Sequence, residues 1–444
     1  MFDFFKVFFS SVAGPLFLVV GLFVMYKTFS IIGVKLSPVL SILIALSPIW
    51  LTLALFFTMH KKWMDYVRMK FILFNGRTTL RIHLPQEVFK SPEAMESVMA
   101  QIHNVANPDN LMHTYIDGRH PLIYSFELVS IGGEVRFYVN VPTKKTKNAI
   151  EAQLYAQYPG IEVVEEELDY TDEIVWNPDK YEMISFHITK KEDQVFPVKT
   201  YIDFGLDKLP KEEQKFEPMA SMIEQLGKAK PHERVWIQIL CRPHAKKNFK
   251  TGYLQEKVTW EKSVQDKVNE ILKRDTRVIV DKLENEKSPM LTIYEKEKIA
   301  AMERNVGKYA YETGIRVMYI TQKGKFDGDI LSPTLRTFAQ YDILNRNGLG
   351  VRWRTDFDYN FFSDFTGKKK DKLKRVELIE YKLREYSTRD KRTRLDSPKV
   401  MSVEELATIF HIPGSSVVTP SLPRITSTRK EAPSNLPTGI VIGR

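Results

Sequence analysis

The residues best suited to chemistry lie in one late stretch of the chain, VRWRTDFDYNFFSDFTGKKKDKLKR at positions 351–375. Aromatic rings offer stacking faces and cations offer phosphate contacts, a combination that holds single-stranded nucleic acid without reading its sequence. Two other interpretations stay open: a core-packing segment followed by a solvated basic helix, and a patch that faces anionic lipid. The candidate binding residues are Arg352, Trp353, Arg354, Lys368, Lys369, Lys370, Lys372, Lys374 and Arg375.

Motifs that carry catalysis are missing from the sequence. There is no G-x-x-x-x-G-K-[ST] loop for a triphosphate, no G-x-S-x-G elbow and no H-E-x-x-H zinc motif. Cys241 and His244 have the spacing of half a zinc site, but the chain has no second cysteine to complete it. Asp356 and Asp358 imitate the start of a calcium loop, yet Phe361 stands where glycine must turn the chain. The sequence therefore predicts a protein that is not an enzyme and has no cofactor or metal.

Charge is unevenly distributed along the 444 residues, whose net charge is +10. Residues 1–70 carry +5 and residues 367–399 carry +7, so basicity is confined to the N-terminal segment and one late segment. The single cysteine rules out an intramolecular disulfide and suits a reducing compartment. The size and the apolar fraction of 43% allow two or more folded domains.

Two long uncharged stretches occupy the N-terminal segment. Twenty residues separate Lys6 from Lys27, and twenty-four separate Lys35 from His60, each long enough to cross a bilayer as a helix. One continuous helix over both would be far too long for a single crossing, so residues 1–70 are predicted to form a two-span transmembrane hairpin. A buried helical hairpin of a soluble core is the competing interpretation.

The basic residues beside these stretches predict an orientation. Lys61, Lys62, Arg68 and Lys70 follow the second stretch closely, and the positive-inside bias then places both termini and the main body in the cytoplasm. The predicted location is the plasma (inner) membrane. A cleaved signal peptide fits less well, because the small-residue cleavage site is missing and a second apolar stretch follows.

In residues 71–176 the spacing of apolar residues alternates between that of strands and that of helices, in the order of a ferredoxin-like β-α-β-β-α-β domain. TLRIHL predicts a strand, a helix follows Ser91, and two strands join at Gly132 and Gly133, a pair that suits a tight hairpin turn. A helix at about 144–157 and a strand at IEVVEEEL complete the unit. This is an architecture and carries no activity by itself.

Residues 177–386 predict a second, decorated α+β domain. Strands at 181–190 and 196–204, a helix ended by Gly227 and a strand at 233–243 precede a polar, lysine-rich insertion at 244–289. Helix, strand and helix then follow. The fold class is α+β, and a diverged duplication of the first domain stays open.

The tail, residues 387–444, changes character. A short helix at 402–410 is capped by Ser402 and has one apolar stripe, and proline, serine and threonine dominate after it. So short a helix needs a surface to cover its stripe, either this protein's own second domain or the groove of a partner. The candidate docking residues are Val403, Leu406, Ala407, Phe410, His411 and Pro413.

The tail carries a resemblance to a known superfamily. MSVEELATIFHIPG, with its His411-Ile412-Pro413 step and the later Asn435-Leu436-Pro437, resembles the segment that precedes the ATPase core of HerA–FtsK DNA translocases, including those of type IV secretion and conjugation. FELVSIGGEVRFYVNVP is similar to a membrane-proximal domain in an uncharacterised family of candidate-phyla bacteria. Since the sequence ends at Arg444, where the ATPase would begin, the ATPase activity is not carried over.

The resemblance implies a membrane-anchored, non-catalytic component of a type IV secretion-like or conjugative DNA-transfer apparatus. Its expected partners are a separately encoded HerA–FtsK-type ATPase, the membrane and single-stranded DNA, and self-association stays open. The alternatives are a membrane scaffold that binds lipid and protein without nucleic acid, and an enzyme whose site has no sequence signature.

Overall fold

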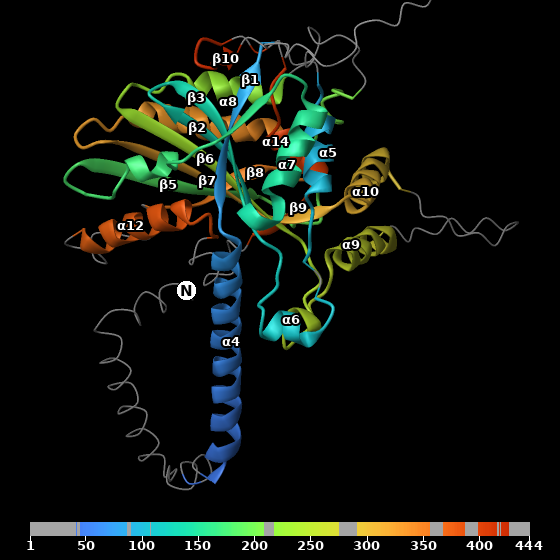
Figure 1. Ribbon diagram of the computed structural model, residues 1–444. Coiled ribbons are helices and arrows are strands. Elements are labelled where there is room, and N and C mark those ends of the chain that lie inside the picture. Colours follow the sequence, from blue (N-terminus) through green and yellow to red (C-terminus); the bar gives the residue numbers. More distant parts are fainter. Residues whose placement is uncertain are drawn as a thin grey trace, which may run out of the picture.

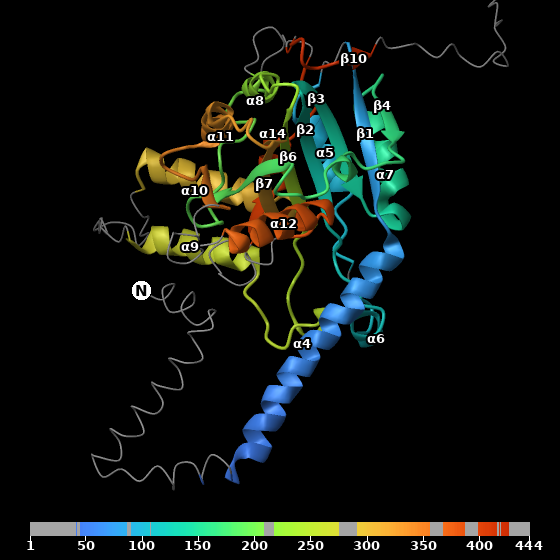
Figure 2. The same cartoon turned by 90° about the vertical axis from the view of Figure 1, so that its left-hand side faces the viewer.

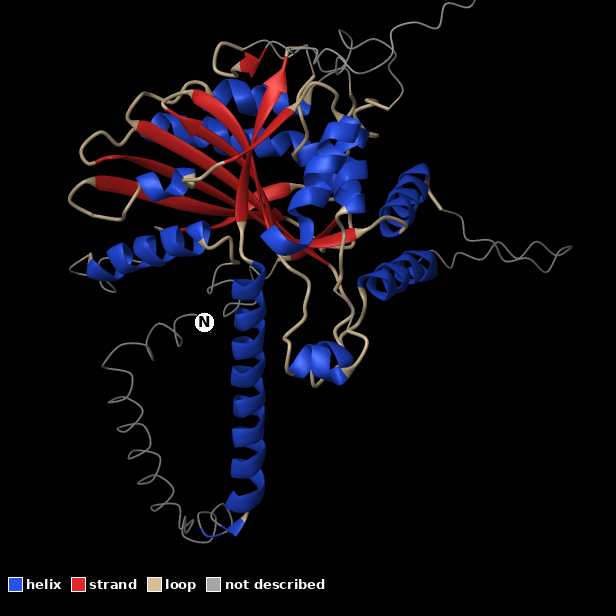
Figure 3. Ribbon diagram, in the orientation of Figure 1, coloured by secondary structure: helices blue, strands red, loops and turns tan. Residues whose placement is uncertain are grey.

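In the computed structural model of the chain, the described residues are 41, 45–86, 90–106, 108–207, 217–274, 291–355, 367–386, 398–414, 417 and 419–425. They form a ten-stranded, mostly antiparallel sheet flanked by helices (Figure 1, Figure 3). The strands are β1 (Thr78–Pro85), β2 (Tyr124–Ile131), β3 (Glu134–Val141), β4 (Glu162–Glu165), β5 (Tyr181–Lys190), β6 (Glu233–Pro243), β7 (Ala310–Gln322), β8 (Leu349–Arg354), β9 (Lys399–Ser402) and β10 (Arg424–Ile425). The α-helices are α4 (Ser47–Asn75), α5 (Glu93–Gln101), α6 (Leu111–Tyr115), α7 (Thr143–Gln157), α8 (Pro218–Leu226), α9 (Trp260–Arg274), α10 (Ile293–Val306), α11 (Leu331–Arg336), α12 (Lys368–Lys382) and α14 (Val403–Ile409).

The strand order repeats within the sheet. β4-β1-β3-β2 are joined by antiparallel pairs, with β1 through β4 and the helices α5 and α7 in the β-α-β-β-α-β order along the chain. β8-β5-β7-β6 follow the same relative order, again antiparallel. The two sets meet where β2 pairs with β6 in an unbroken register from Tyr124↔Cys241 to Ile131↔Arg234. The boundary predicted at residue 176 therefore does not separate two independent sheets.

Side chains alternate between the two faces of the sheet because successive strand residues point to opposite sides. Phe126 and Leu128 join the larger apolar core, which α5, α7, α8 and α14 cover; we call this side the large-core face. Val129 and Trp236 point the other way and pack against α12 and the 3-10 turn η1 (Tyr170–Glu173); we call this side the α12 face.

The predicted insertion falls between β6 and β7. Helix α9 packs on α10 there and forms a third apolar cluster with Val195, Phe196 and Val400. The strand predicted at 196–204 is wrong, because the chain turns at 201–207. The Asp203 carboxylate accepts hydrogen bonds from the Thr200 amide (2.9 Å) and hydroxyl (3.2 Å), and these local bonds favour a turn over a ladder.

Helix α4 leaves the sheet as a long rod, which Figures 1 and 2 show from two sides. Its C-terminal half is anchored to the body: the Trp63 indole donates to the Tyr115 carbonyl (2.6 Å), and Arg68 donates to the Thr251 carbonyl (3.1 Å). Ahead of these contacts, large apolar side chains such as Ile49 and Phe57 are exposed.

The predicted two-span transmembrane hairpin is corrected by the structure. Within the described part of the chain, no helix is both long and apolar enough to cross a membrane. The uncharged part of α4 is limited to Ser47–Met59, about 20 Å at 1.5 Å per residue, and polar His60 and charged Lys61 and Lys62 continue the same helix. The first predicted span, residues 7–26, lies outside the described residues.

The tail is part of the body where the structure describes it. β9 pairs with β7, β10 pairs in parallel with β1, and Val417 and Leu422 are buried in the larger core. Residues 387–397 and 426–444 lie outside the described residues. The prediction of an extended tail is thus wrong for the described residues 398–414, 417 and 419–425, which supply enough apolar side chains to pack.

Candidate functional site

Helix α12 carries most of the predicted basic residues and lies across one face of the sheet. Gly367 precedes it at φ 70°, a left-handed conformation that glycine adopts without steric cost. Leu373, Leu378 and Tyr381 are buried against the sheet. Its N-terminal half carries the exposed Lys368, Lys369, Lys372 and Arg375 and the half-exposed Lys370 and Lys374, which are spread around more than one side of the helix.

A row of polar side chains crosses the sheet beneath α12. Glu127, Gln238, Arg316 and His187 are register partners on β2, β6, β7 and β5, so all four point to the α12 face. The Gln238 amide donates to Glu127 (3.1 Å) and to the carbonyl of Tyr381 (3.0 Å). His187 Nε2 lies 3.0 Å from a carboxylate oxygen of α12, that of Glu377. Together these contacts tie the sheet to the C-terminal half of the helix.

Arg384, just after α12, completes this polar layer. Its guanidinium Nε lies 3.0 Å from Glu127 Oε1 and its Nη2 lies 2.7 Å from Asp169 Oδ2. The hydroxyls of Tyr170 and Tyr381 are 2.9 Å apart, and burial raises the pKa of both well above the usual range, so both stay protonated as hydrogen-bond donors. The buried end of α12 is therefore fixed by charge-assisted bonds, which leave its basic end at the surface.

The structure divides the predicted nucleic-acid patch between the two faces of the sheet. Arg354 is in register with Phe186, whose side chain belongs to the large-core face, whereas α12 lies on the other face. Arg352 donates to the carbonyl of Lys191 at this edge. Trp353 is in register with His187, and residues 356–366 lie outside the described residues. The lysine-rich half of the patch, 368–375, lies together in the N-terminal half of α12.

The predicted docking residues lie inside the protein. Helix α14 begins where predicted, with a capping box in which Ser402 accepts from the Glu405 amide and Glu405 accepts from the Ser402 amide. Its apolar stripe packs in the larger core, and Pro413 is buried too. Val403, Leu406, Ala407, Phe410 and His411 are at most 2% exposed. The stripe therefore covers this chain's own sheet and leaves no apolar surface for a partner; residues 435–437 lie outside the described residues.

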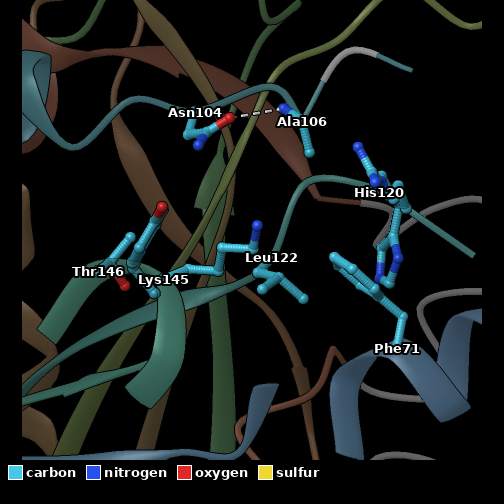
Figure 4. Close-up of a pocket in the computed structure, with 9 residues that line it drawn as sticks. Phe71, Asn104, Ala106, His120, Leu122, Lys145 and Thr146 are labelled. Carbon is cyan, nitrogen blue, oxygen red and sulfur yellow. Dashed lines mark hydrogen bonds between the residues drawn. The ribbon is translucent and has the colours of Figure 1, made fainter. Parts of the chain in front are cut away.

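A pocket that the sequence did not indicate lies between α4, the loop after α5 and the start of α7 (Figure 4). It has a volume of about 210 Å³ and is lined by Phe71, by Asn104 and Ala106, by residues of 119–124, and by Lys145 and Thr146. Figure 4 shows Lys145 extending across the pocket toward Leu122. In the sequence, the feature that could have indicated this pocket is the basic first turn TKKTK of a predicted helix. It places cations at a helix N-terminus, where acidic residues are favoured.

No group of three or more histidine, cysteine, aspartate or glutamate side chains in the described part of the chain is arranged to hold a metal ion. Cys241 is fully buried in β6, and burial raises the pKa of its thiol well above the usual range. A thiol in that environment stays protonated and is a poor nucleophile or ligand.

A family model described as a domain of unknown function (DUF8128) matches residues 75–341. This span covers more than half of the 444 residues, so the chain belongs to this family. It runs from the end of α4 through β7 to the 3-10 turn η5 (Thr337–Tyr341), which includes most of the pocket but not α12 or α14. No curated protein and no solved structure matches the chain.

Proposed function

We propose that this chain is a non-catalytic component of a type IV secretion-like or conjugative DNA-transfer apparatus, in which it holds single-stranded DNA beside a separately encoded translocase ATPase. The observation that carries the proposal is the basic N-terminal half of α12, presented at the surface of a folded body. The resemblance of the tail to translocase connectors supplies the biological setting.

The placement of these lysines is not explained by helix stability. The N-terminus of a helix carries a partial positive charge, so each cation near it costs about 0.3–1 kcal/mol. Lys368, Lys369 and Lys370 open α12 nonetheless, and Asp371 is its acidic residue in the first turn. A bound polyanion would offset this repulsion and would release counterions, which is the main source of sequence-independent affinity for DNA.

The buried half of α12 explains why the basic surface can stay in place without its ligand. Glu377 is fixed to the sheet by His187, Tyr381 is fixed to η1 by Tyr170, and Arg384 is fixed to the sheet by Glu127. When DNA binds, few protein side chains other than the lysines of α12 then need to become ordered. A preorganised surface loses less entropy on binding than a flexible basic tail would.

The experiment compares the full chain with two quadruple variants that remove the same charge. The first replaces Lys368, Lys369, Lys370 and Lys372 with glutamine, and affinity for a fluorescent oligothymidine should fall at least tenfold. The control replaces four exposed lysines elsewhere, Lys180, Lys228, Lys257 and Lys325, and should retain the affinity. Equal losses of affinity in both variants would mean that binding depends only on the net charge of the protein. Unchanged binding in the first variant would refute the proposal.

The same two variants test the alternative of a scaffold that binds lipid but not nucleic acid. Vesicles containing phosphatidylserine take the place of the oligonucleotide. Loss of vesicle binding in the α12 variant, without any DNA binding by the wild type, would favour the scaffold.

The partnership with an ATPase has its own test. If a translocase ATPase is encoded beside this chain, its stimulation by single-stranded DNA should increase when the wild-type protein is added and not when the α12 variant is added. Stimulation by both proteins alike would separate the ATPase partnership from DNA binding.

A further inference from the structure

The pocket beside α7 has an electrostatic character that suits an anion. Its lining includes Arg119, His120 and Lys145 and contains no aspartate or glutamate. Arg119 Nε lies 3.7 Å from Asp117 Oδ2, and about half of the Asp117 side chain is exposed. Such a long, solvated pair is weak, so Arg119 can turn to a stronger ligand at little cost.

The helix that forms one wall adds to this potential. α7 begins after Pro142 with no side-chain cap and no acidic residue in its first turn. The Thr143 amide donates to the Gly76 carbonyl (3.3 Å), and the helix dipole makes this end of α7 electropositive. Lys145 and Thr146, from this first turn, line the pocket.

His120 contributes an acceptor on the opposite side. Its Nδ1 lies 2.8 Å from the carbonyl oxygen of Gly118, and because a carbonyl only accepts, Nδ1 carries the proton. Nε2 is then an unprotonated acceptor. Burial, aided by the neighbouring Arg68 and Arg242, lowers the pKa of His120 to about 4, which keeps the ring neutral at physiological pH. Phe71 packs beside the ring, with centroids 5.6 Å apart.

Donors on one side and a neutral acceptor on the other distinguish a phosphate group from a carboxylate. A phosphate monoester near neutral pH has a second pKa of about 6 and exists partly with one protonated oxygen. Its charged oxygens match Lys145 and Arg119, and its P–OH matches His120 Nε2. At about 210 Å³ the pocket is below the ~300–1,000 Å³ typical of sites for drug-sized ligands, so a small molecule fits it best.

We propose that this pocket binds the phosphate group of a small phosphate monoester, held by Lys145, Arg119 and the first turn of α7. Ile150 and Leu154 place α7 on the large-core face, whereas α12 lies on the other face. The site is therefore independent of the proposed DNA-binding surface, and either can fail without the other.

The probes are inorganic phosphate and glycerol 3-phosphate, titrated by calorimetry into the full chain, with chloride at equal ionic strength as the reference. Arg119→Gln with Lys145→Gln should weaken binding at least tenfold. The control for the Lys145 charge is Lys144→Gln, one residue away on α7, whose ammonium lies over the Phe74 ring at 3.7 Å. This control should bind like the wild type.

Several results would overturn the proposal. These are the absence of any heat with both probes at millimolar concentration, or an equal loss in Lys144→Gln, which would mean that only the general field of α7 is involved. Arg119→Lys keeps the positive charge and should retain most of the wild-type affinity for phosphate. That result would show that the loss in the double variant comes from the missing charge and not from misfolding. Oligothymidine binding by the double variant should be unchanged, which separates failure of this site from failure at α12.

Discussion

At the scale of single residues, the polar layer beneath α12 shows how charge can be buried when every group has a partner. Arg384 has φ 52°, an unfavourable conformation for a residue with a side chain, and its guanidinium holds both Glu127 and Asp169. Two charged contacts at 3.0 Å and 2.7 Å compensate this local strain.

We predict that Arg384→Met destabilises the protein by about 3–5 kcal/mol, because Glu127 would be left as an uncompensated buried charge. Urea denaturation measures the change, with Arg375→Met on the exposed side of α12 as the control. A loss below about 1 kcal/mol would mean that water or another side chain replaces the guanidinium.

Gly118 fixes the contact between α4 and the body. It has φ +69°, and a Cβ at this position would lie 2.1 Å from the backbone carbonyl oxygen of Val67 on α4. We predict that Gly118→Ala lowers the melting temperature clearly more than Gly205→Ala. Gly205 has φ +73°, and a Cβ there would meet no atom within 4 Å, so its substitution isolates the backbone penalty of about 1 kcal/mol. Equal shifts would show that α4 moves away without cost.

His120 gives the protein a defined sensitivity to acid. Its pKa is lowered from 6.5 to about 4 in the folded state, mainly by burial. Between these values the unfolded chain binds a proton that the folded chain does not, so stability must fall as pH decreases through this window. His120→Gln removes the effect, and its melting temperature should drop less between pH 7 and about pH 5 than that of the wild type. If the melting temperatures of the wild type and the variant drop equally, the sensitivity to acid comes from other groups.

At the scale of elements, α14 shows what periodicity can and cannot predict. Ser402 and the spacing of Val403, Leu406 and Phe410 predict its cap and its stripe, and the structure contains both. Periodicity identifies a face to be covered but does not identify the surface that covers it. The apolar strands β2 and β3, more than 260 residues earlier, supply that surface through Phe126 and Phe137, whose rings lie 5.3 and 5.8 Å from Phe410.

We predict that Phe410→Ala costs about 3–5 kcal/mol of stability, as expected for a large aromatic removed from a packed core. Ile379→Ala on α12, where the side chain is 45% exposed, is the control and should cost little. Thermal denaturation of the isolated protein decides. Unchanged stability together with loss of an ATPase partner would restore the docking role that the sequence suggested.

Two basic helix starts differ in how easily the sequence reveals them. The run at 368–375 is dense enough to be noticed, whereas Lys144 and Lys145 belong to an ordinary surface helix. The start of α7 becomes part of a pocket only in the folded protein, where Arg119, His120 and Asn104 from other segments lie beside it. Such convergence leaves no pattern in the local sequence.

At the scale of the whole molecule, the alternating helix and strand periods predicted most elements but not their assembly. The junction between β2 and β6 depends on the pairing of two strands that are buried on both faces but lie more than a hundred residues apart; one of these faces includes the polar Glu127 and Gln238. Strand periodicity indicates that both faces are buried, but it does not say which strand lies beside which. The N-terminal prediction failed for a different reason, since counting uncharged residues did not reveal where α4 would begin.

This assembly places a basic helix on one face of a continuous sheet, and we propose that this helix binds single-stranded DNA. The most direct test is the dependence of affinity on salt for the wild type and for the variant with glutamine at Lys368, Lys369, Lys370 and Lys372. Each phosphate contact with single-stranded DNA contributes about 0.7 to the slope of log K against log salt concentration, so four lost contacts should flatten it by roughly 3. An unchanged slope would contradict the claim, because the lysines of α12 would then contact no phosphate.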